Sequence, residues 1–253
     1  MTDKTDQSEE GTMDLKKVFV DSKDFQNIQE VSIPEEMNTK IKCGIDFVDG
    51  MFGDGEQLGF TPGTVTIFTG APGGGKSTLS LQMANGFASQ DIVTAYSSSE
   101  EHVSQIKKVV DRLGLEHPFY VSSSNNVDNV LKQAKDNDVK VLFIDSLQMM
   151  GTGKYDPGTT KATKVAAQKI IAFCKERFVV GIVIGHVTKQ SVLAGPLAVK
   201  HAMDAHLHLD VCTNLNCLTC EPGVRTLALQ KNRFGLSNQP QQLFLFAQGF
   251  KKI

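Results

Sequence analysis

The sequence lacks the features that would place it in a membrane or outside the cell. No apolar run approaches the roughly 20 residues that a membrane-spanning helix needs, and the N-terminus has no apolar core of the signal-peptide kind. Five cysteines among 253 residues are an odd number, which does not suit a disulfide framework. We therefore expect a protein of a reducing compartment such as the cytoplasm, with no membrane partner.

A strong net charge is also missing. The 26 Lys and Arg residues are balanced by 28 Asp and Glu residues, which leaves a formal net charge of −2. No global basic field points to nucleic acid, so any contact with a polyanion must be local. Apolar residues make up 40% of the chain, which is ample for the core of one large α/β domain preceded by a polar tail.

A glycine-rich junction follows an apolar run and precedes a helical pattern. Val65, Ile67 and Phe68 predict a short buried strand, and the apolar spacing between Leu79 and Phe87 predicts a helix. The junction matches G-x-x-x-x-G-K-[ST], in the strand–loop–helix context that this phosphate-binding pattern requires. The predicted nucleotide-binding residues are Gly70, Ala71, Pro72, Gly73, Gly74, Gly75, Lys76, Ser77 and Thr78.

Each residue type in this loop has a physical reason to be there. Glycines allow backbone N–H groups to approach phosphate oxygens, and a helix N-terminus provides a favourable field for anions. Lys76 is expected to reach the β- and γ-phosphates of ATP, and Ser77 to bind Mg²⁺. The alternative, a glycine-rich turn that matches by chance, does not explain why both flanks also fit.

Asp145 ends a second predicted strand, Val139 to Ser146. In P-loop enzymes an acid at this position holds the Mg²⁺ shell, and this edge of a parallel sheet is where ligands bind. The alternative is an aspartate that caps the next segment. A third predicted strand ends at His186, which either senses the γ-phosphate or is a buried histidine with one hydrogen bond.

Two adjacent acids follow the predicted strand that contains Ile92, Val93 and Ala95. A carboxylate at the end of that strand can orient or activate the attacking water, with Glu100 the first choice and Glu101 the second. The competing interpretation is a capping pattern, Ser-x-x-Glu, near a helix start. The alternation of strands and helices along the chain predicts an α/β fold with a mostly parallel central sheet flanked by helices.

Several segments together resemble the RecA-like ATPase core, and most closely that of the RadA (Sms) branch-migration proteins. They appear in the family's order and cover roughly residues 40 to 246, so we assign 1–35 to a partly disordered tail or arm and 36–253 to the ATPase domain. The segments are "GAPGGGKSTLSLQMA", "YSSSEEHVSQIKKVVDRLG", "VLFIDSLQMM", "GHVTKQSVLAGPLAVKHAMDAHLHLD" and "LQKNRFG".

The resemblance implies a function and a set of roles. It implies a subunit of a ring or filament with ATP and Mg²⁺ at the subunit interface, which binds single-stranded DNA during recombination, repair or replication. By the same resemblance Lys76 and Glu100 are catalytic, and Lys231 and Arg233 of "KNRFG" reach the nucleotide of a neighbour. A cation supplied in trans would stabilise charge on the transferring phosphoryl group. The alternative for Lys231 and Arg233 is a solvated loop.

Two lysine-bearing loops, 151–164 and 188–201, are expected to face DNA. Cations follow the phosphates of a single strand, and an aromatic ring can stack on a base. Without the resemblance both loops are ordinary solvated segments. The predicted contact residues are Lys154, Tyr155, Lys161, Lys164, Lys189 and Lys200.

The chain departs from the family at both ends. Proteins of the RadA family have three parts, which are an N-terminal four-cysteine zinc finger, the ATPase core and a C-terminal Lon-protease-like domain. Here the first 40 residues contain no cysteine, and the sequence ends at Ile253, just past the core. This is more similar to the stand-alone RecA-like recombinases and annealing proteins of phages, which would work with a single-strand-binding protein.

A cysteine-containing insert is the other departure. Cys217 and Cys220 have the spacing of a metal knuckle, and Cys212 is a third candidate zinc ligand. His206, His208 or Asp210 would complete four ligands, since strand alternation places them on one face. The alternative is a polar hairpin with incidental thiols.

Two other functions compete with the recombinase interpretation. One is a replicative-helicase motor of the DnaB type, which shares the RecA-like core. The other is a nucleotide-gated assembly module without DNA activity, in which ATP sets only the oligomeric state. The helicase motor would differ by translocating processively, with an extra N-terminal domain. Loss of DNA stimulation with retained nucleotide-dependent assembly would favour the assembly module.

Overall fold

The computed structural model describes residues 27–186, 197–212, 223–237 and 240–252. Two compact units are distinguished, Met1–Ser32 and Ile33–Ile253. The described part of the first unit contains one 3-10 helix, η2 (Ile28–Glu30), which begins where the Asn27 side chain accepts a hydrogen bond from the N–H of Gln29. The second unit carries the predicted motifs.

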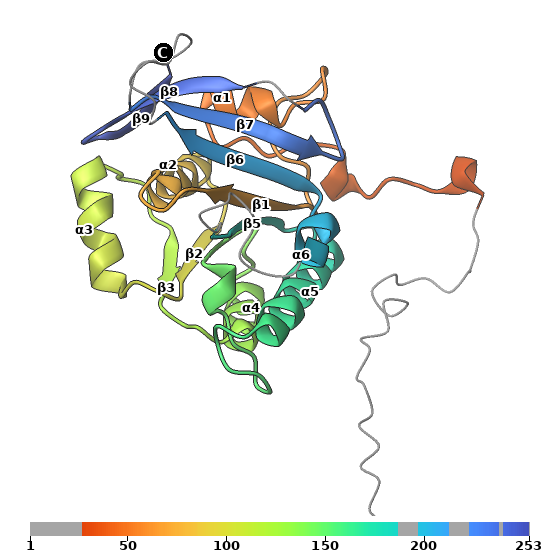
Figure 1. The fold of residues 1–253 in the computed structure, drawn as a ribbon. Helices are drawn as coiled ribbons and strands as arrows, with labels where there is room; N and C mark the ends of the chain where they lie inside the picture. Colours follow the sequence, from red (N-terminus) through yellow and green to blue (C-terminus); the bar gives the residue numbers. More distant parts are fainter. Residues whose placement is uncertain (1–26, 187–196, 213–222, 238–239, 253) are drawn as a thin grey trace, which may run out of the picture. The chain divides into compact units, whose positions relative to one another are not determined.

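A nine-stranded sheet organises the described residues of the second unit, in the order β3-β2-β4-β5-β1-β6-β7-β8-β9 (Figure 1). The strands from β3 to β6 in this order are parallel, and β7, β8 and β9 extend the sheet with antiparallel pairings. The bounds are β1 (Val65–Gly70), β2 (Thr94–Ser98), β3 (Tyr120–Ser122), β4 (Val141–Asp145), β5 (Val180–Ile184), β6 (Ala205–Val211), β7 (Arg225–Asn232), β8 (Gln241–Phe246) and β9 (Gly249–Lys252).

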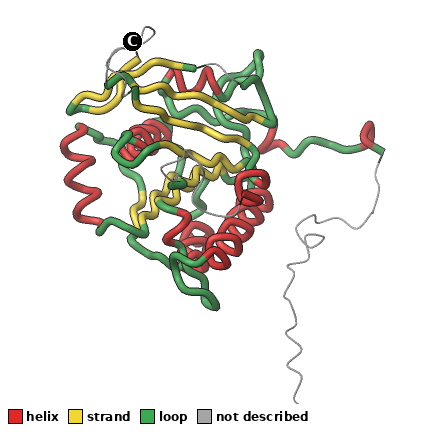
Figure 2. Tube along the Cα trace, viewed as in Figure 1, coloured by secondary structure: helices red, strands yellow, loops and turns green. Residues whose placement is uncertain are grey.

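Helices cover both faces of this sheet, so the predicted α/β fold with a mostly parallel sheet is confirmed (Figure 2). Helices α2 and α3 lie on one face, and α4, α5 and α6 lie on the other (Figure 1). In the described ranges no helix is long and apolar enough to cross a membrane. The bounds are η3 (Glu35–Met37), α1 (Asp46–Met51), α2 (Lys76–Ala88), α3 (Val103–Leu113), α4 (Val127–Asp136), η4 (Leu147–Met149), α5 (Thr160–Arg177) and α6 (Leu197–Ala202).

Two strand boundaries differ from the sequence prediction for identifiable reasons. The strand expected from Val139 begins at Val141, because the N–H of Val139 bonds the carbonyl of Ala134 and closes the end of α4. The sequence predicts a strand from Val224 to Gln230 before "KNRFG", but the observed strand continues to Asn232, because its pairing with β6 extends to Ala205. Lys231 therefore belongs to the sheet rather than to a loop.

An aromatic row fills the core between the sheet and α2. The ring centroids of Phe52 and Phe60 are 4.0 Å apart, those of Phe60 and Phe87 are 5.4 Å apart, and those of Phe87 and Phe143 are 6.3 Å apart. Tyr96 ends the row, 5.9 Å from Phe143. All five side chains are buried, and burial of such large apolar surfaces is a main source of stability for this face.

Gly86 of α2 permits a close approach of the helix to the segment before α1. Its backbone torsions are ordinary helical ones, but a Cβ atom built on it would overlap with the carbonyl oxygen of Cys43. Cys43 is itself fully buried, and its N–H donates to the carboxylate of Asp49 at 2.8 Å. The glycine is therefore needed for distance and not for backbone freedom.

We expect Gly86→Ala to lower the free energy of unfolding by about 1–3 kcal/mol, because the added methyl group forces α2 away from Cys43. Gly50→Ala is the matched control, since Gly50 lies in α1 with open space around its Cα. That control should leave stability unchanged or raise it by up to about 1 kcal/mol. Urea unfolding of both variants measures the difference, and equal stabilities would contradict the packing argument.

Candidate functional site: a nucleotide pocket at the carboxyl edge of the sheet

The carboxyl ends of β1, β2, β4 and β5 converge on one pocket. Its cavity volume is about 340 Å³. Neighbouring parallel strands end at the same edge, so polar residues that follow each strand meet there. The lining residues are Pro72, Gly73, Gly75, Lys76, Ser77, Thr78, Ser98, Glu100, Glu101, Asp145, His186 and Leu245.

The predicted phosphate loop connects β1 to α2 as expected. Helix α2 begins at Lys76 without a side-chain cap, so its first N–H groups remain available to an anion. Gly75 precedes it with φ +107°, in the left-handed region that favours glycine. A Cβ atom there would lie 2.6 Å from the ring of Phe250, so β9 packs directly against the loop.

Lys76 is folded back into this loop. Its ammonium donates to the carbonyl oxygens of Gly70 at 2.9 Å and Ala71 at 3.0 Å. Burial lowers the pKa of Lys76, while the opposite charges of Asp145 and Glu100 act against that decrease. The cation is thus held inside the loop, at the place where phosphate oxygens are expected.

Ser77 and Asp145 provide a donor set that fits Mg²⁺. The Ser77 hydroxyl donates to Oδ2 of Asp145 at 2.8 Å, and both residues line the pocket. A hydroxyl oxygen and a carboxylate are hard ligands of the kind that Mg²⁺ binds together with nucleotide phosphates. The two residues predicted to hold Mg²⁺ from distant parts of the sequence are therefore brought together.

Glu100 is held at the pocket by two side chains. Ser146 Oγ donates to Glu100 Oε1 at 2.5 Å, and His186 Nε2 lies 2.7 Å from the same oxygen. Burial raises the pKa of Glu100, but the hydrogen bonds from Ser146 and His186 outweigh it, so the net pKa lies below its usual value. The carboxylate is therefore ionised at neutral pH, as an acceptor of a water proton must be.

Glu101 lies in a different environment from its neighbour. Burial raises its pKa, and the charges of Asp145 and Glu100 raise it further. Neither acid caps α3, because the cap is His102, whose ring accepts from Ser104 N–H while Gln105 bonds its backbone. The helix is thus capped by His102, while the Ser98 hydroxyl accepts from the N–H of Glu101 at 3.0 Å, so one half of the Ser-x-x-Glu pattern is formed just before it.

Lys231 and Arg233 lie at the opposite edge of the sheet. Arg233 Nη1 pairs with Asp204 Oδ1 at 3.0 Å, and Asp204 Oδ2 accepts from the N–H of Val65, the first residue of β1. Lys231 donates to the carbonyls of His201 at 3.1 Å and Met203 at 2.5 Å. The length of β1, about 16 Å, separates them from the phosphate loop of their own chain.

The predicted DNA-contact residues fall into two places. Lys154 and Lys161 both lie over the ring of Tyr155, at 5.8 and 4.9 Å from its centroid, and Lys164 is exposed one turn further along α5. Lys200 lies instead in α6, which ends just before β6 begins. Lys189 is outside the described residues.

The zinc prediction is not supported. Cys217 and Cys220 lie outside the described residues, and within the described ranges no group of three His, Cys, Asp or Glu side chains could hold a metal ion. His208 instead bonds Thr69 Oγ1 at 2.7 Å through Nδ1 and Asp210 at 3.1 Å through Nε2. His206 bonds the same threonine at 2.6 Å.

Five residues at or beside the pocket were not predicted as site residues from the sequence: Tyr96, Ser98, Ser146, Gln148 and Leu245. Ser146 follows Asp145 directly, which was an available signal. Gln148 accepts from the N–H of His186 at 3.2 Å, and nothing in its local sequence points there. Leu245 lies in β8, about 170 positions after the phosphate loop in the sequence.

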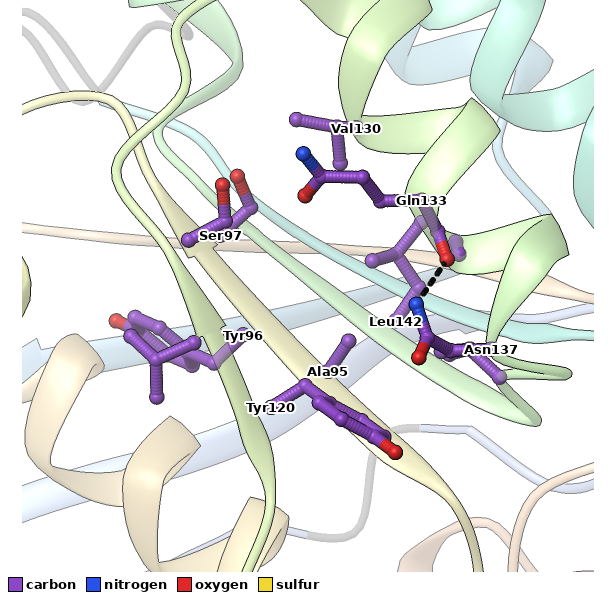
Figure 3. Close-up of a pocket in the computed structure, with 12 residues that line it drawn as sticks. Ala95, Tyr96, Ser97, Tyr120, Val130, Gln133, Asn137 and Leu142 are labelled. Atoms are coloured by element: carbon purple, nitrogen blue, oxygen red, sulfur yellow. Dashed lines mark hydrogen bonds between the residues drawn. The ribbon is translucent and has the colours of Figure 1, made fainter.

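A second, smaller cavity of about 90 Å³ lies between β2, β3 and α4 (Figure 3). Val130, Gln133 and Leu142 are among the side chains that line it, and Asn137 Nδ2 donates to the carbonyl of Gln133 at 2.8 Å. It lies on the α4 side of the sheet, whereas the phosphate loop and α2 lie on the other. It is therefore separate from the nucleotide pocket.

The fold and the pocket define a P-loop ATPase. The profile of the family described as "ATPase family associated with various cellular activities (AAA)" matches residues 66–211. That range begins in β1 and ends in β6, so it contains the phosphate loop, Glu100, Asp145 and His186. The chain belongs to this ATPase family.

The relatives refine the family. The DNA repair protein RadA of Mycobacterium tuberculosis (strain ATCC 25618 / H37Rv) is 34% identical over 215 residues, which are 83% of this chain and 42% of the relative. That of Escherichia coli (strain K12) is 30% identical over 231 residues, 90% of this chain and 47% of the relative. The RadA-like ATPase core is thereby confirmed, and the chain spans less than half the length of these relatives.

Two solved structures share the fold. The KaiC-like protein PH0186 of Pyrococcus horikoshii OT3 has a TM-score of 0.68 and 18% identity, over 85% of this chain and 98% of that one. The solved ATPase domain of a further protein has a TM-score of 0.74 and 14% identity, over 87% of this chain and 93% of that one.

We expect Glu100→Gln to keep ATP binding and to slow ATP hydrolysis by about 10² to 10⁴, because the amide cannot accept a proton from water. Glu101→Gln removes the same charge from the adjacent residue and should change the rate less than about threefold. Single-turnover hydrolysis and binding of a fluorescent ATP analogue measure the two effects. If Glu101→Gln hydrolysed ATP slowly and Glu100→Gln hydrolysed it at the wild-type rate, Glu101 would be the residue that activates water.

Proposed function

We propose that this chain is an ATPase that binds single-stranded DNA as a homo-oligomer and acts in DNA recombination, repair or replication. The RadA relatives are named as DNA repair proteins, and the proposal assigns a function of that kind to this chain, which matches less than half of their length. The observation that carries it is the position of Lys231 and Arg233, which cannot reach the ATP pocket of their own chain. A cytoplasmic location and a single-strand-binding partner are part of the proposal.

The opposite placement of pocket and cations favours assembly in a ring or filament. A head-to-tail contact brings the amino edge of one sheet against the carboxyl edge of the next and repeats around an axis. In that contact Arg233, whose side chain is about half exposed, faces the phosphates of the neighbour. Asp204 holds the guanidinium until then and is itself anchored to β1.

A local cation cluster supports the DNA contact. Lys154 and Lys161 are exposed and both lie over the ring of Tyr155, so two cations and one aromatic ring meet where this loop enters α5. This combination suits a flexible single strand, because phosphates pair with the lysines and a base can stack on the ring. The neighbouring Asp128 does not cancel this charge, since it pairs with Lys169 at 2.5 Å.

His186 supports a link between DNA and hydrolysis. Its imidazole lies 2.7 Å from Glu100, and the second lysine-bearing loop begins two residues later. Gln148 holds the backbone of His186 by two hydrogen bonds: its Oε1 accepts from the N–H of His186, and its Nε2 donates to the carbonyl of His186. A displacement of His186 would therefore change how Glu100 is held, which connects the loop to the group predicted to activate water.

Subunit mixing tests the oligomer. Lys76→Ala and Arg233→Ala proteins should each hydrolyse ATP at least about tenfold more slowly than wild type. The first lacks the cation of its own phosphate loop, and the second lacks the cation proposed to act on the nucleotide of the neighbouring subunit. In a random 1:1 mixture, about a quarter of neighbouring pairs combine an intact loop with an intact Arg233, so about a quarter of the wild-type rate should return. Lys76→Ala mixed with the Lys76→Ala/Arg233→Ala double variant is the control and should stay inactive. No recovery in the first mixture would contradict action in trans.

The ATP hydrolysis rate with and without single-stranded DNA tests the DNA function. We expect DNA to stimulate hydrolysis, and this stimulation should fade as the salt concentration rises. In a plot of log DNA affinity against log salt concentration, the slope of a Lys154→Ala/Lys161→Ala variant should be shallower by about 1.4, or about 0.7 for each lost phosphate contact. Lys107→Ala/Lys132→Ala removes the same charge from lysines paired with aspartates on α3 and α4, and should leave the slope unchanged. Hydrolysis indifferent to DNA would favour the nucleotide-gated assembly module.

A further inference from the structure

A buried phenol contacts the predicted Mg²⁺-binding carboxylate. The hydroxyl of Tyr96 donates to Oδ2 of Asp145 at 2.6 Å, and the Tyr96 residue is 1% exposed. The Ser77 hydroxyl donates to the same oxygen at 2.8 Å. Two hydroxyl groups from different elements therefore converge on one oxygen of the acid at the end of β4.

The register of the sheet explains how the phenol reaches that position. Ser98 of β2 pairs with Asp145 of β4, and Tyr96 lies two residues earlier on the same face of β2. A tyrosine side chain is long enough to extend along the strand over that interval. Figure 3 shows the Tyr96 ring directed away from Ser97 and Gln133, which lie on the α4 side of the strand.

Core packing holds the ring in this orientation. The ring of Tyr96 stacks on Phe143 at an interplanar angle of 27°, and Phe143 packs in turn against Phe87 of α2. The Tyr96 hydroxyl is the donor of this hydrogen bond, because the carboxylate oxygen that it contacts is an acceptor.

The two hydroxyl groups differ in what Mg²⁺ requires of them. Ser77 is also a predicted Mg²⁺ ligand, so a lone pair of its oxygen must turn toward the metal when the metal is bound. Tyr96 is not a predicted Mg²⁺ ligand, and its ring cannot move without disturbing the aromatic row. A carboxylate that is only 7% exposed needs a donor that persists in both states.

We propose that Tyr96 is a positioning residue for Mg²⁺: its hydroxyl holds the carboxylate of Asp145 in the orientation in which it serves the metal beside Ser77. The inference concerns nucleotide and metal binding in the ATPase site and is independent of the proposed DNA function. The phosphate-binding pattern does not include Tyr96, which lies in a different strand.

Tyr96→Phe tests the proposal, because it removes one oxygen atom and keeps the ring. Binding of a fluorescent ATP analogue is measured in EDTA and at increasing Mg²⁺ concentration, without DNA. We expect unchanged binding in EDTA and an approximately tenfold higher Mg²⁺ concentration for half-maximal binding. Tyr120→Phe removes the same atom from an exposed tyrosine of β3 and should not move that midpoint.

Thermal unfolding in EDTA separates positioning from a structural role. If the Tyr96 hydroxyl served only folding, Tyr96→Phe would unfold at a lower temperature with an unchanged Mg²⁺ midpoint, and this result would overturn the proposal. Loss of DNA stimulation in the wild type would reject the proposed function and leave this measurement untouched.

A second measurement keeps the native residue and covers the case in which Tyr96→Phe does not fold. The chain has three tyrosines and no tryptophan, so Tyr120→Phe/Tyr155→Phe leaves Tyr96 as the single emitting residue. We expect Mg²⁺ added to the ATP-bound protein to change this emission, because the phenol is bonded to the carboxylate that meets the metal. ATP in EDTA should leave it unchanged, and equal emission with and without Mg²⁺ would overturn the proposal.

Discussion

The parallel pairing of β1 with β5 and β6 is the constraint on which the functional geometry depends. β1 is hydrogen-bonded along both edges and buried on both faces, so its direction cannot change without loss of the core. Its carboxyl end continues into the phosphate loop. Its amino end donates a hydrogen bond from Val65 to Asp204, which holds Arg233. One strand thus separates the ATP pocket from the cations proposed to serve a neighbour.

Electrostatic balance in the pocket follows from the same convergence of strand ends. Three acids, Asp145, Glu100 and Glu101, surround one cation, Lys76, in a partly desolvated space. Their mutual repulsion is visible in the raised pKa of Glu101, to which burial contributes most and the two neighbouring charges add. Hydroxyl donors from Ser77, Tyr96 and Ser146 offset part of this charge. Such a site suits a metal–nucleotide complex, which brings both cation and anion.

Much of the fold and of the site could be predicted because the signals are local. The phosphate loop lies between an apolar run and a helical pattern, and each needs only about ten residues to be recognised. Asp145 could be placed because four apolar residues precede it. Strand ends were less predictable: Val139 was expected in a strand, but its N–H completes the end of α4 instead. The capping of α3 by His102 was missed because histidine is an uncommon cap.

The sequence by itself determined the ATPase class, the alternation of strands and helices, and the residues predicted to contact phosphate, because these depend on residues close together in the chain. Only the tertiary structure decided which distant groups meet. Tyr96 reaches Asp145 through the pairing of β2 with β4, and Glu100 meets His186 across 86 positions. The same is true of the position of Lys231 and Arg233 at the amino edge, which follows from the antiparallel return of β7 along β6. Strand order and register set these distances, and local sequence patterns carry no information about either.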